Sequence, residues 1–342
     1  MLETTWFVLW GLLWAVYFVL DGFDFGMGTL LPFLAKNDEE KRIIYNAAGP
    51  YWDGNEVWLI TAGGVTFAAF PKAYAVMFSA LYAPLLILLF ALIFRAVSFE
   101  FRNKKDCPQW RKFWDACQFL GNFLPALLLG VAFANLFMGI PIDGNGVYHG
   151  NIIKLLNPYG LAGGIFFVLI FCMHGALWLA LKSEGDIHER AVGAAQVVWP
   201  LVLAVALLFL ALTAFYTNLY ANYAEHPTLL IFPILAVASL LTVRVMIWAD
   251  NLLGAWFFSA LFIITVTFFG VLGMYPGIII SNIDPAYSVT VFNGASSQLT
   301  LKIMLGVTLC CIPVVIAYQA WVYYTFAHKV TPESLQKDDH AY

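Results

Sequence analysis

The chain has 342 residues, of which 62% are hydrophobic and 11% are charged. A soluble domain usually has about 45–50% apolar and about 25% charged residues, so this composition excludes a soluble globular protein and a disordered chain. The net charge of −4, with 17 scattered Lys and Arg residues, offers no basic stripe and excludes a nucleic-acid binder. The sequence therefore predicts an all-α integral membrane protein, folded as a single membrane domain over residues 1–342.

Apolar runs long enough to cross a bilayer as a helix, about 20 residues each, recur along the chain. Nine segments are predicted to span the membrane: 5–34, 53–70, 74–97, 115–140, 158–181, 192–216, 229–247, 252–275 and 298–326. The first lacks the basic start of a cleaved signal peptide and is too long for one, so we expect it to remain as a helix. The second is the weakest, because Gly63 and Gly64 disfavour a helix and Pro71 ends it.

The positive charges orient these spans. With the N-terminus outside, fourteen of the 17 Lys and Arg residues fall in or beside cytoplasmic connections, and only Lys72, Lys154 and Lys302 fall on the other side. This asymmetry follows the positive-inside rule, and it is lost if the span at 53–70 is removed. We therefore expect a multi-pass membrane protein with the N-terminus outside and the C-terminus in the cytoplasm.

Acidic residues interrupt two of the predicted spans. Asp21 and Asp24 lie in the first span, Asp21 roughly 24 Å below its outer end at 1.5 Å per residue, and their i, i+3 spacing places both on one helix face. Asp53 and Glu56 repeat this spacing where the second span begins on the cytoplasmic side. Placing an acidic side chain at the centre of a membrane helix costs at least about 2.5–3.5 kcal/mol of insertion free energy. Each of these residues therefore needs a functional or structural explanation.

Each acid has a functional and a structural interpretation. Buried carboxylates can take up and release protons, so the four acids together predict a route for protons from the cytoplasm. Alternatively, Asp53 and Glu56 cap the N-terminus of their helix. For the mid-helix pair in the first span, the structural alternative is an ion pair with Arg95 or Arg244 or packing against a partner helix.

Other residue types give weaker signals. One histidine, His174, lies within a span, so the chain lacks the facing histidine pairs that a membrane cytochrome b uses as axial ligands, and we interpret it as a hydrogen-bonded core residue. The five cysteines form no CxxC pattern, and neither a disulfide framework nor a metal site is predicted.

Several motifs together resemble subunit II of the cytochrome bd-type quinol oxidases. The most specific is WDGNEVWLITAGG at 52–64, preceded by DGFDFG at 21–26 and ND at 37–38. Further matches extend over nearly the whole chain: FAAFP at 67–71, GVAF at 130–133, LNPYGL at 156–161 and SSQLT at 296–300.

The resemblance implies a fold of two four-helix bundles plus one peripheral helix. It also implies a heterodimer in which subunit I ligates haems of b and d type and holds the quinol site, whereas subunit II ligates no haem. Such a complex lies in a bacterial or archaeal cytoplasmic (inner) membrane, where it oxidises quinol and reduces O₂ to water, which generates proton motive force. A structural quinone and a small single-helix accessory subunit are further candidates for the complex, but no motif places either of them in this chain.

The resemblance also carries residue roles. The acid that subunit II supplies to a cytoplasmic proton route matches Asp53, and the acid of the first helix matches Asp24. Some members have Gln at the position of Glu56, which favours a cap over a proton carrier there. No catalytic residue is expected in this chain, so activity would belong to the complex.

Two other functions remain open at this point. A multi-helix secondary transporter would also use buried carboxylates and Gly/Pro-interrupted spans, although no internal repeat is visible. A pure assembly scaffold would tolerate substitution of the buried acids without loss of turnover.

Overall fold

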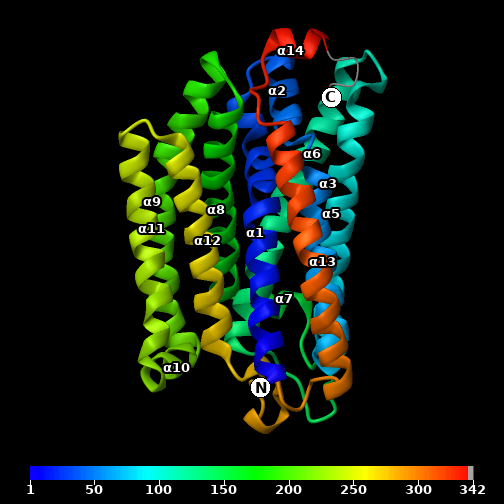
Figure 1. Ribbon diagram of the computed structural model, residues 1–342, viewed down its shortest axis with the longest axis vertical. Coiled ribbons are helices and arrows are strands. Elements are labelled where there is room, and N and C mark those ends of the chain that lie inside the picture. The colour runs from blue at the N-terminus through cyan, green and yellow to red at the C-terminus, as the bar shows by residue number, and fades with distance from the viewer. Residues whose placement is uncertain (338–341) are drawn as a thin grey trace.

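The computed structural model describes residues 1–337 and 342, and these residues form long helices that run roughly side by side (Figure 1). The long helices are α1 (Leu2–Leu34), α3 (Trp52–Ala69), α5 (Tyr82–Phe101), α6 (Pro108–Met138), α8 (Pro158–Lys182), α9 (Gly185–Tyr216), α11 (Ile231–Trp248), α12 (Leu252–Met274) and α13 (Gln298–Thr325). Eight of the helices described are long and apolar enough to cross a membrane, and α3 is not among them. The prediction of an all-α membrane protein is confirmed, and the ninth span at 53–70 stays a prediction.

Shorter elements connect the long helices. They are α2 (Asp38–Ala48), α4 (Pro71–Ala80), η1 (Arg102–Lys104), α7 (Ile152–Leu155), α10 (Leu219–Glu225), η2 (Pro227–Leu230), η3 (Pro285–Tyr287) and α14 (Pro332–Lys337). The strands β1 (Gly277–Ile279) and β2 (Val289–Thr290) form an antiparallel pair in the connection between α12 and α13. The elements α2 and α14 lie at the opposite end of the molecule from the N-terminus (Figure 1).

Helix ends differ from the predicted spans where charged residues continue a helix beyond its apolar part. Helix α6 begins at Pro108 and α9 at Gly185, each 7 residues before its predicted span. Arg111 and Lys112 thus extend α6 by about two turns past the apolar run. The predicted span at 74–97 is also divided, because α4 ends at Ala80 and α5 begins at Tyr82.

Helix α1 lies at the centre and packs against α3, α6, α8 and α12. Its contact with α8 is backbone to backbone: a Cβ on Gly26 would lie 1.8 Å from the Phe171 carbonyl oxygen, and one on Gly175 would lie 2.5 Å from the Met27 nitrogen. Only glycine permits this approach. Helices α9 and α11 lie on one side of this centre and α5 on the other (Figure 1), but the division into two four-helix bundles stays a prediction.

Helix α3 runs antiparallel to α1 over much of its length. Near one end of α3, Asn55 donates a hydrogen bond to Asp24 (2.7 Å), and near the other end Thr66 accepts one from Trp10 (2.8 Å). The stretch of α1 between these contacts is about 21 Å long at 1.5 Å per residue. Helix α3 therefore passes through the same depth as the apolar core of α1, as a membrane span would.

Helix α13 packs against α1 and α3 but leaves most of its surface exposed, and Leu301 is its one buried residue among those described. Ser297 caps its N-terminus by accepting a hydrogen bond from the Thr300 N–H (3.2 Å). The exposed residues include large apolar side chains such as Ile303, Leu309 and Trp321. This arrangement agrees with a peripheral helix.

Candidate functional site

Arg95 on α5 binds acids from two other helices. Its guanidinium is fully buried and donates to both carboxylate oxygens of Asp21 on α1, at 2.7 and 3.2 Å. It also donates to Glu56 on α3 at 2.9 Å, and it lies 4.8 Å from the centroid of the Phe25 ring. We call Arg95, Asp21 and Glu56 the Arg95 cluster. It joins α1, α3 and α5 at one level of the molecule.

The charges of the Arg95 cluster explain why Asp21 can be buried. Moving an ion out of water costs several kcal/mol, and a partner in two-pronged hydrogen-bond geometry offsets much of this cost. One guanidinium faces two carboxylates, so the cluster carries a formal charge of −1 when all three groups are ionised. The ion-pair alternative from the sequence thus describes Asp21 correctly, with Arg95 as the partner. Arg244 takes no part, because it lies between Trp199 and Trp248 on another helix pair.

Asp24 has a different environment from Asp21. It is 3% exposed and contacts no cation among the described residues. One carboxylate oxygen accepts the 2.7 Å hydrogen bond from Asn55 Nδ2, and the other, Oδ1, has no hydrogen-bond partner in the described part of the chain. Asn55 in turn accepts a 2.9 Å hydrogen bond from the Tyr323 hydroxyl of α13. Asp24 is therefore a buried carboxyl group that is hydrogen-bonded but not neutralised by a nearby positive charge.

Asp53 is not part of this buried group. Its side chain is exposed at the first turn of α3, and no described residue donates a hydrogen bond to it. Glu56, one turn further along, points inward and is 24% exposed. The capping alternative for Glu56 is wrong, because its carboxylate pairs with Arg95 rather than with backbone N–H groups. The structure thus brings together Asp21, Asp24 and Glu56. Asp53 lies one turn from Glu56, at the exposed start of α3.

Sequence reasoning missed two members of this site. Asn55 lies inside the most specific motif, at 52–64, and its position between Asp53 and Glu56 was a usable signal. Tyr323 had no such signal, because it is 268 residues away in the sequence. His174 is a hydrogen-bonded core residue, as predicted: Nδ1 lies 2.6 Å from Ser259 Oγ and Nε2 lies 3.1 Å from the Val19 carbonyl oxygen.

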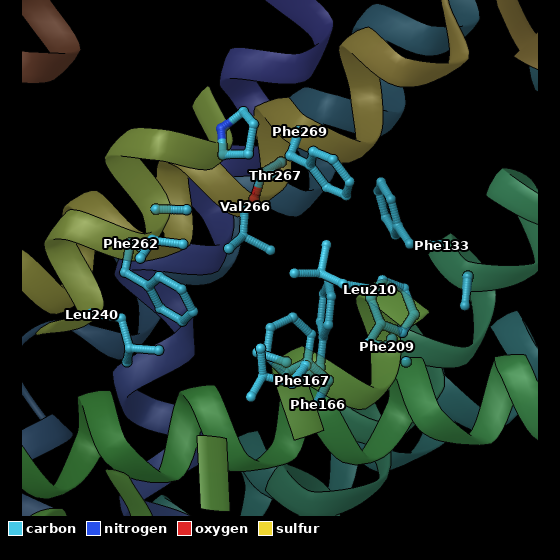
Figure 2. A pocket seen from close by; sticks show the side chains of 18 of the residues that line it. Phe133, Phe166, Phe167, Phe209, Leu210, Leu240, Phe262, Val266, Thr267 and Phe269 are labelled. Atoms are coloured by element: carbon cyan, nitrogen blue, oxygen red, sulfur yellow. The ribbon is translucent and has the colours of Figure 1, made fainter. Parts of the chain in front are cut away.

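An apolar cavity of about 120 Å³ lies between α6, α8, α9, α11 and α12 (Figure 2). Figure 2 shows aromatic and aliphatic side chains around it, including Phe133, Phe166, Phe209 and Phe262. The hydroxyl of Thr267 donates to the Ile263 carbonyl within its own helix (2.8 Å), so it is not free to act as a donor for a ligand. The cavity suits a hydrocarbon group rather than a polar one.

Comparisons with known proteins agree on one family. The family model for cytochrome bd terminal oxidase subunit II matches residues 2–326. Cytochrome bd ubiquinol oxidase subunit 2 of Bacillus subtilis is 37% identical, over 96% of this chain and 97% of the relative. Cytochrome bd-I ubiquinol oxidase subunit 2 of Escherichia coli (strain K12) is 34% identical, over 99% and 98%.

The fold leads to the same group of proteins. A chain from the structure of bd oxidase from Geobacillus thermodenitrificans superposes with a TM-score of 0.79, covering 95% of this chain and 98% of that one, at 16% sequence identity. At this low sequence identity the structural match shows the fold alone. The family assignment rests on the family model and on the relatives with similar sequences. This membrane protein therefore belongs to the subunit II family of the cytochrome bd terminal oxidases.

Proposed function

We propose that this chain is the subunit II of a quinol:O₂ oxidoreductase complex, that it supports a haem-bearing subunit I, and that it contributes to a proton route from the cytoplasm. Family membership and the names of the relatives, which describe ubiquinol oxidase subunits, support this assignment over a secondary transporter. The observation that carries the proton route is Asp24, a buried carboxyl group with one unpartnered oxygen.

The residues of this chain do not suit haem ligation. Both ring nitrogens of His174 are engaged by Ser259 and Val19, and it is the only buried histidine among the described residues. We therefore assign the b- and d-type haems to subunit I. The described residues also contain no group of three His, Cys, Asp or Glu side chains placed to hold a metal ion.

The proposed route begins at Asp53, where water can reach the carboxylate. Glu56 lies one turn deeper on α3 and belongs to the Arg95 cluster, and Asp24 follows on α1, one turn from Asp21. The formal negative charge of the cluster favours protons over anions at this level. Asn55 holds the Asp24 side chain in place by a hydrogen bond, and the Tyr323 hydroxyl in turn donates a hydrogen bond to Asn55. The role of this chain is to take up and hold protons, and the chemistry with O₂ belongs to the partner.

The apolar cavity of Figure 2 is the proposed place for the tail of a structural quinone. Its lining offers hydrocarbon contacts and no free polar group for a quinone ring, so the ring would have to bind outside it. Extraction of the purified complex with solvent, followed by measurement of the number of quinone molecules per complex, tests this proposal. Less than one quinone for each complex would contradict it.

Purification with neighbouring proteins tests the function itself. A tagged chain isolated from membranes is expected to bring a second large membrane subunit and to show haem absorption bands, with a small single-helix subunit as a further candidate. The matched preparation is a tagged, unrelated multi-pass protein from the same membranes. A colourless chain that moves a solute in liposomes would contradict the oxidase assignment.

The orientation in the membrane is a separate prediction. Lys104, between α5 and α6, is expected in the cytoplasm, and Lys154, in α7, is expected outside. In whole cells, an impermeant thiol reagent should label the Lys154→Cys variant and leave Lys104→Cys unlabelled, in a background without the native cysteines. Lysed cells provide the control, in which both variants react. Labelling of Lys104→Cys in intact cells would contradict this topology.

The chain is also predicted to be unstable without its partner. Helices α3 and α5 expose large apolar residues, among them Ile60, Phe67 and Phe90. Expressed without subunit I, the chain should be degraded or aggregate, as size-exclusion chromatography in detergent would show. Recovery of a monodisperse and thermally stable monomer would contradict this prediction.

A further inference from the structure

Lys182, at the C-terminal end of α8, is a buried cation that has no acidic partner among the described residues. It is 5% exposed, and its ammonium donates to the Tyr51 hydroxyl (2.7 Å) and to the Phe326 carbonyl oxygen (2.5 Å). The rings of Tyr51 and Trp178 each lie 5.1 Å from Nζ. Among the residues that the structure describes, no carboxylate forms an ion pair with it.

This environment distinguishes Lys182 from the other buried cations. Arg95 and Arg102, the two other buried basic residues in the described part of the chain, each bind two carboxylates. Buried charges are normally paired, because neutral acceptors and ring faces offset only part of the cost of desolvation. Within residues 1–337 and 342, Lys182 therefore lacks the counter-ion that its burial calls for.

A cavity of about 210 Å³ opens beside Lys182. We call it the Lys182 cavity, and its polar lining comes from Asn46, Tyr51, Lys182, His328 and Ser334. An ammonium group has three N–H donors, and the described residues accept two of them. The third is available to a group inside the cavity. In contrast to the apolar cavity of Figure 2, this one offers the positive charge of Lys182, while the donor groups of Asn46, Tyr51 and Ser334 already bind oxygens of the chain.

We propose that the Lys182 cavity binds an anion with phosphate-type oxygens, from an anionic lipid headgroup or from free phosphate. Lysine is a common point-charge ligand for phosphate, and the His328 ring at the exposed rim can add a second donor. The cavity lies at the end of α13, where Tyr324 and Phe326 expose aromatic rings to the surroundings. Aromatic residues of this kind are typical of the headgroup level of a membrane. The bound anion would supply the missing counter-charge.

Thermal unfolding of the purified complex in detergent tests this proposal. The probes are inorganic phosphate and phosphatidylglycerol in mixed micelles, with phosphatidylcholine as the lipid of neutral headgroup. A bound anion should raise the melting temperature as its concentration increases. In Lys182→Met the half-saturating concentration should rise about tenfold to a hundredfold. Lys329→Gln is the matched control, since this exposed lysine pairs with Glu184 and does not line the cavity, and its response should match the wild type.

A second variant covers the case in which Lys182→Met does not assemble. His328 is exposed, so His328→Glu should leave the fold intact while placing a carboxylate at the rim of the cavity. It should abolish the response to the anion, whereas His328→Gln should keep it. A response to phosphatidylglycerol but not to phosphate identifies a lipid, and a response to both identifies a site open to free anions.

Two results would overturn the proposal. The first is a melting temperature that neither phosphate nor phosphatidylglycerol changes in the wild type. The second is the same half-saturating concentration in the wild type, Lys182→Met and His328→Glu.

Discussion

Arg95→Met should destabilise the complex by about 3–5 kcal/mol, because it leaves Asp21 buried without its cation. Asp21 is fully buried, and both of its carboxylate oxygens accept hydrogen bonds from Arg95. Glu56 is only partly buried, so water can solvate it when Arg95 is lost. Thermal unfolding of the complex in detergent, followed by the loss of haem absorption, measures the effect.

Two further variants separate the ion pair from general damage to the fold. Arg244→Met removes the same side chain from a site where the guanidinium contacts tryptophan rings and a backbone carbonyl but no carboxylate. Arg244→Met should lower the stability of the complex far less than Arg95→Met does. Adding Asp21→Asn to Arg95→Met removes the uncompensated charge and should recover part of the lost stability. Equal melting temperatures for the two arginine variants would mean that the Arg95 cluster adds no stability.

The second large effect concerns turnover rather than stability. Asp53→Asn and Asp24→Asn keep the size of each side chain and remove its ability to carry a proton. The new amide at position 24 can still accept the hydrogen bond from Asn55 through its oxygen. Both variants should assemble with a full haem spectrum and lose quinol oxidase turnover on the order of tenfold or more.

Haem content and turnover, measured on the same preparation, distinguish the alternatives. Asp106→Asn is the matched control, because this exposed acid lies in a loop and pairs with Arg111. If Asp53 only assists the N-terminus of α3, Asp53→Asn should be silent and Asp53→Ala should cost about 0.5–2 kcal/mol. Poor assembly would indicate a structural role. Normal haem with normal turnover in both Asn variants would remove Asp53 and Asp24 from the proton route and favour a scaffold.

The apolar runs predicted the long helices well, because a membrane span needs length and hydropathy and little else. Helix ends were less predictable. Arg111 and Lys112 precede the predicted span at 115–140, but a charged segment at the membrane surface can remain helical. Helix α2 did have a local signal, since Asn37 accepts a hydrogen bond from the Glu40 N–H, the usual N-cap pattern.

The candidate site was predictable in part. The i, i+3 spacing placed Asp21 and Asp24 on one face of α1, as the structure has them. The same spacing in α3 did not reveal that Glu56 points inward while Asp53 is exposed. Residues three apart differ by about 60° around a helix, so the neighbouring helices decide which of them is buried. That choice depends on Arg95, whose pairing with both helices is a property of the tertiary structure.

The backbone contact between Gly26 and Gly175 limits what can move near Asp24. Helix α1 cannot slide along α8 or rotate about its axis here without a collision between main-chain atoms, because no side chain lies between them to adapt. The Asp24 backbone is thus fixed within one turn of this contact. In the proposed proton route, a change of geometry near Asp24 would therefore come from side-chain rotation or from water, and not from a shift of the α1 backbone.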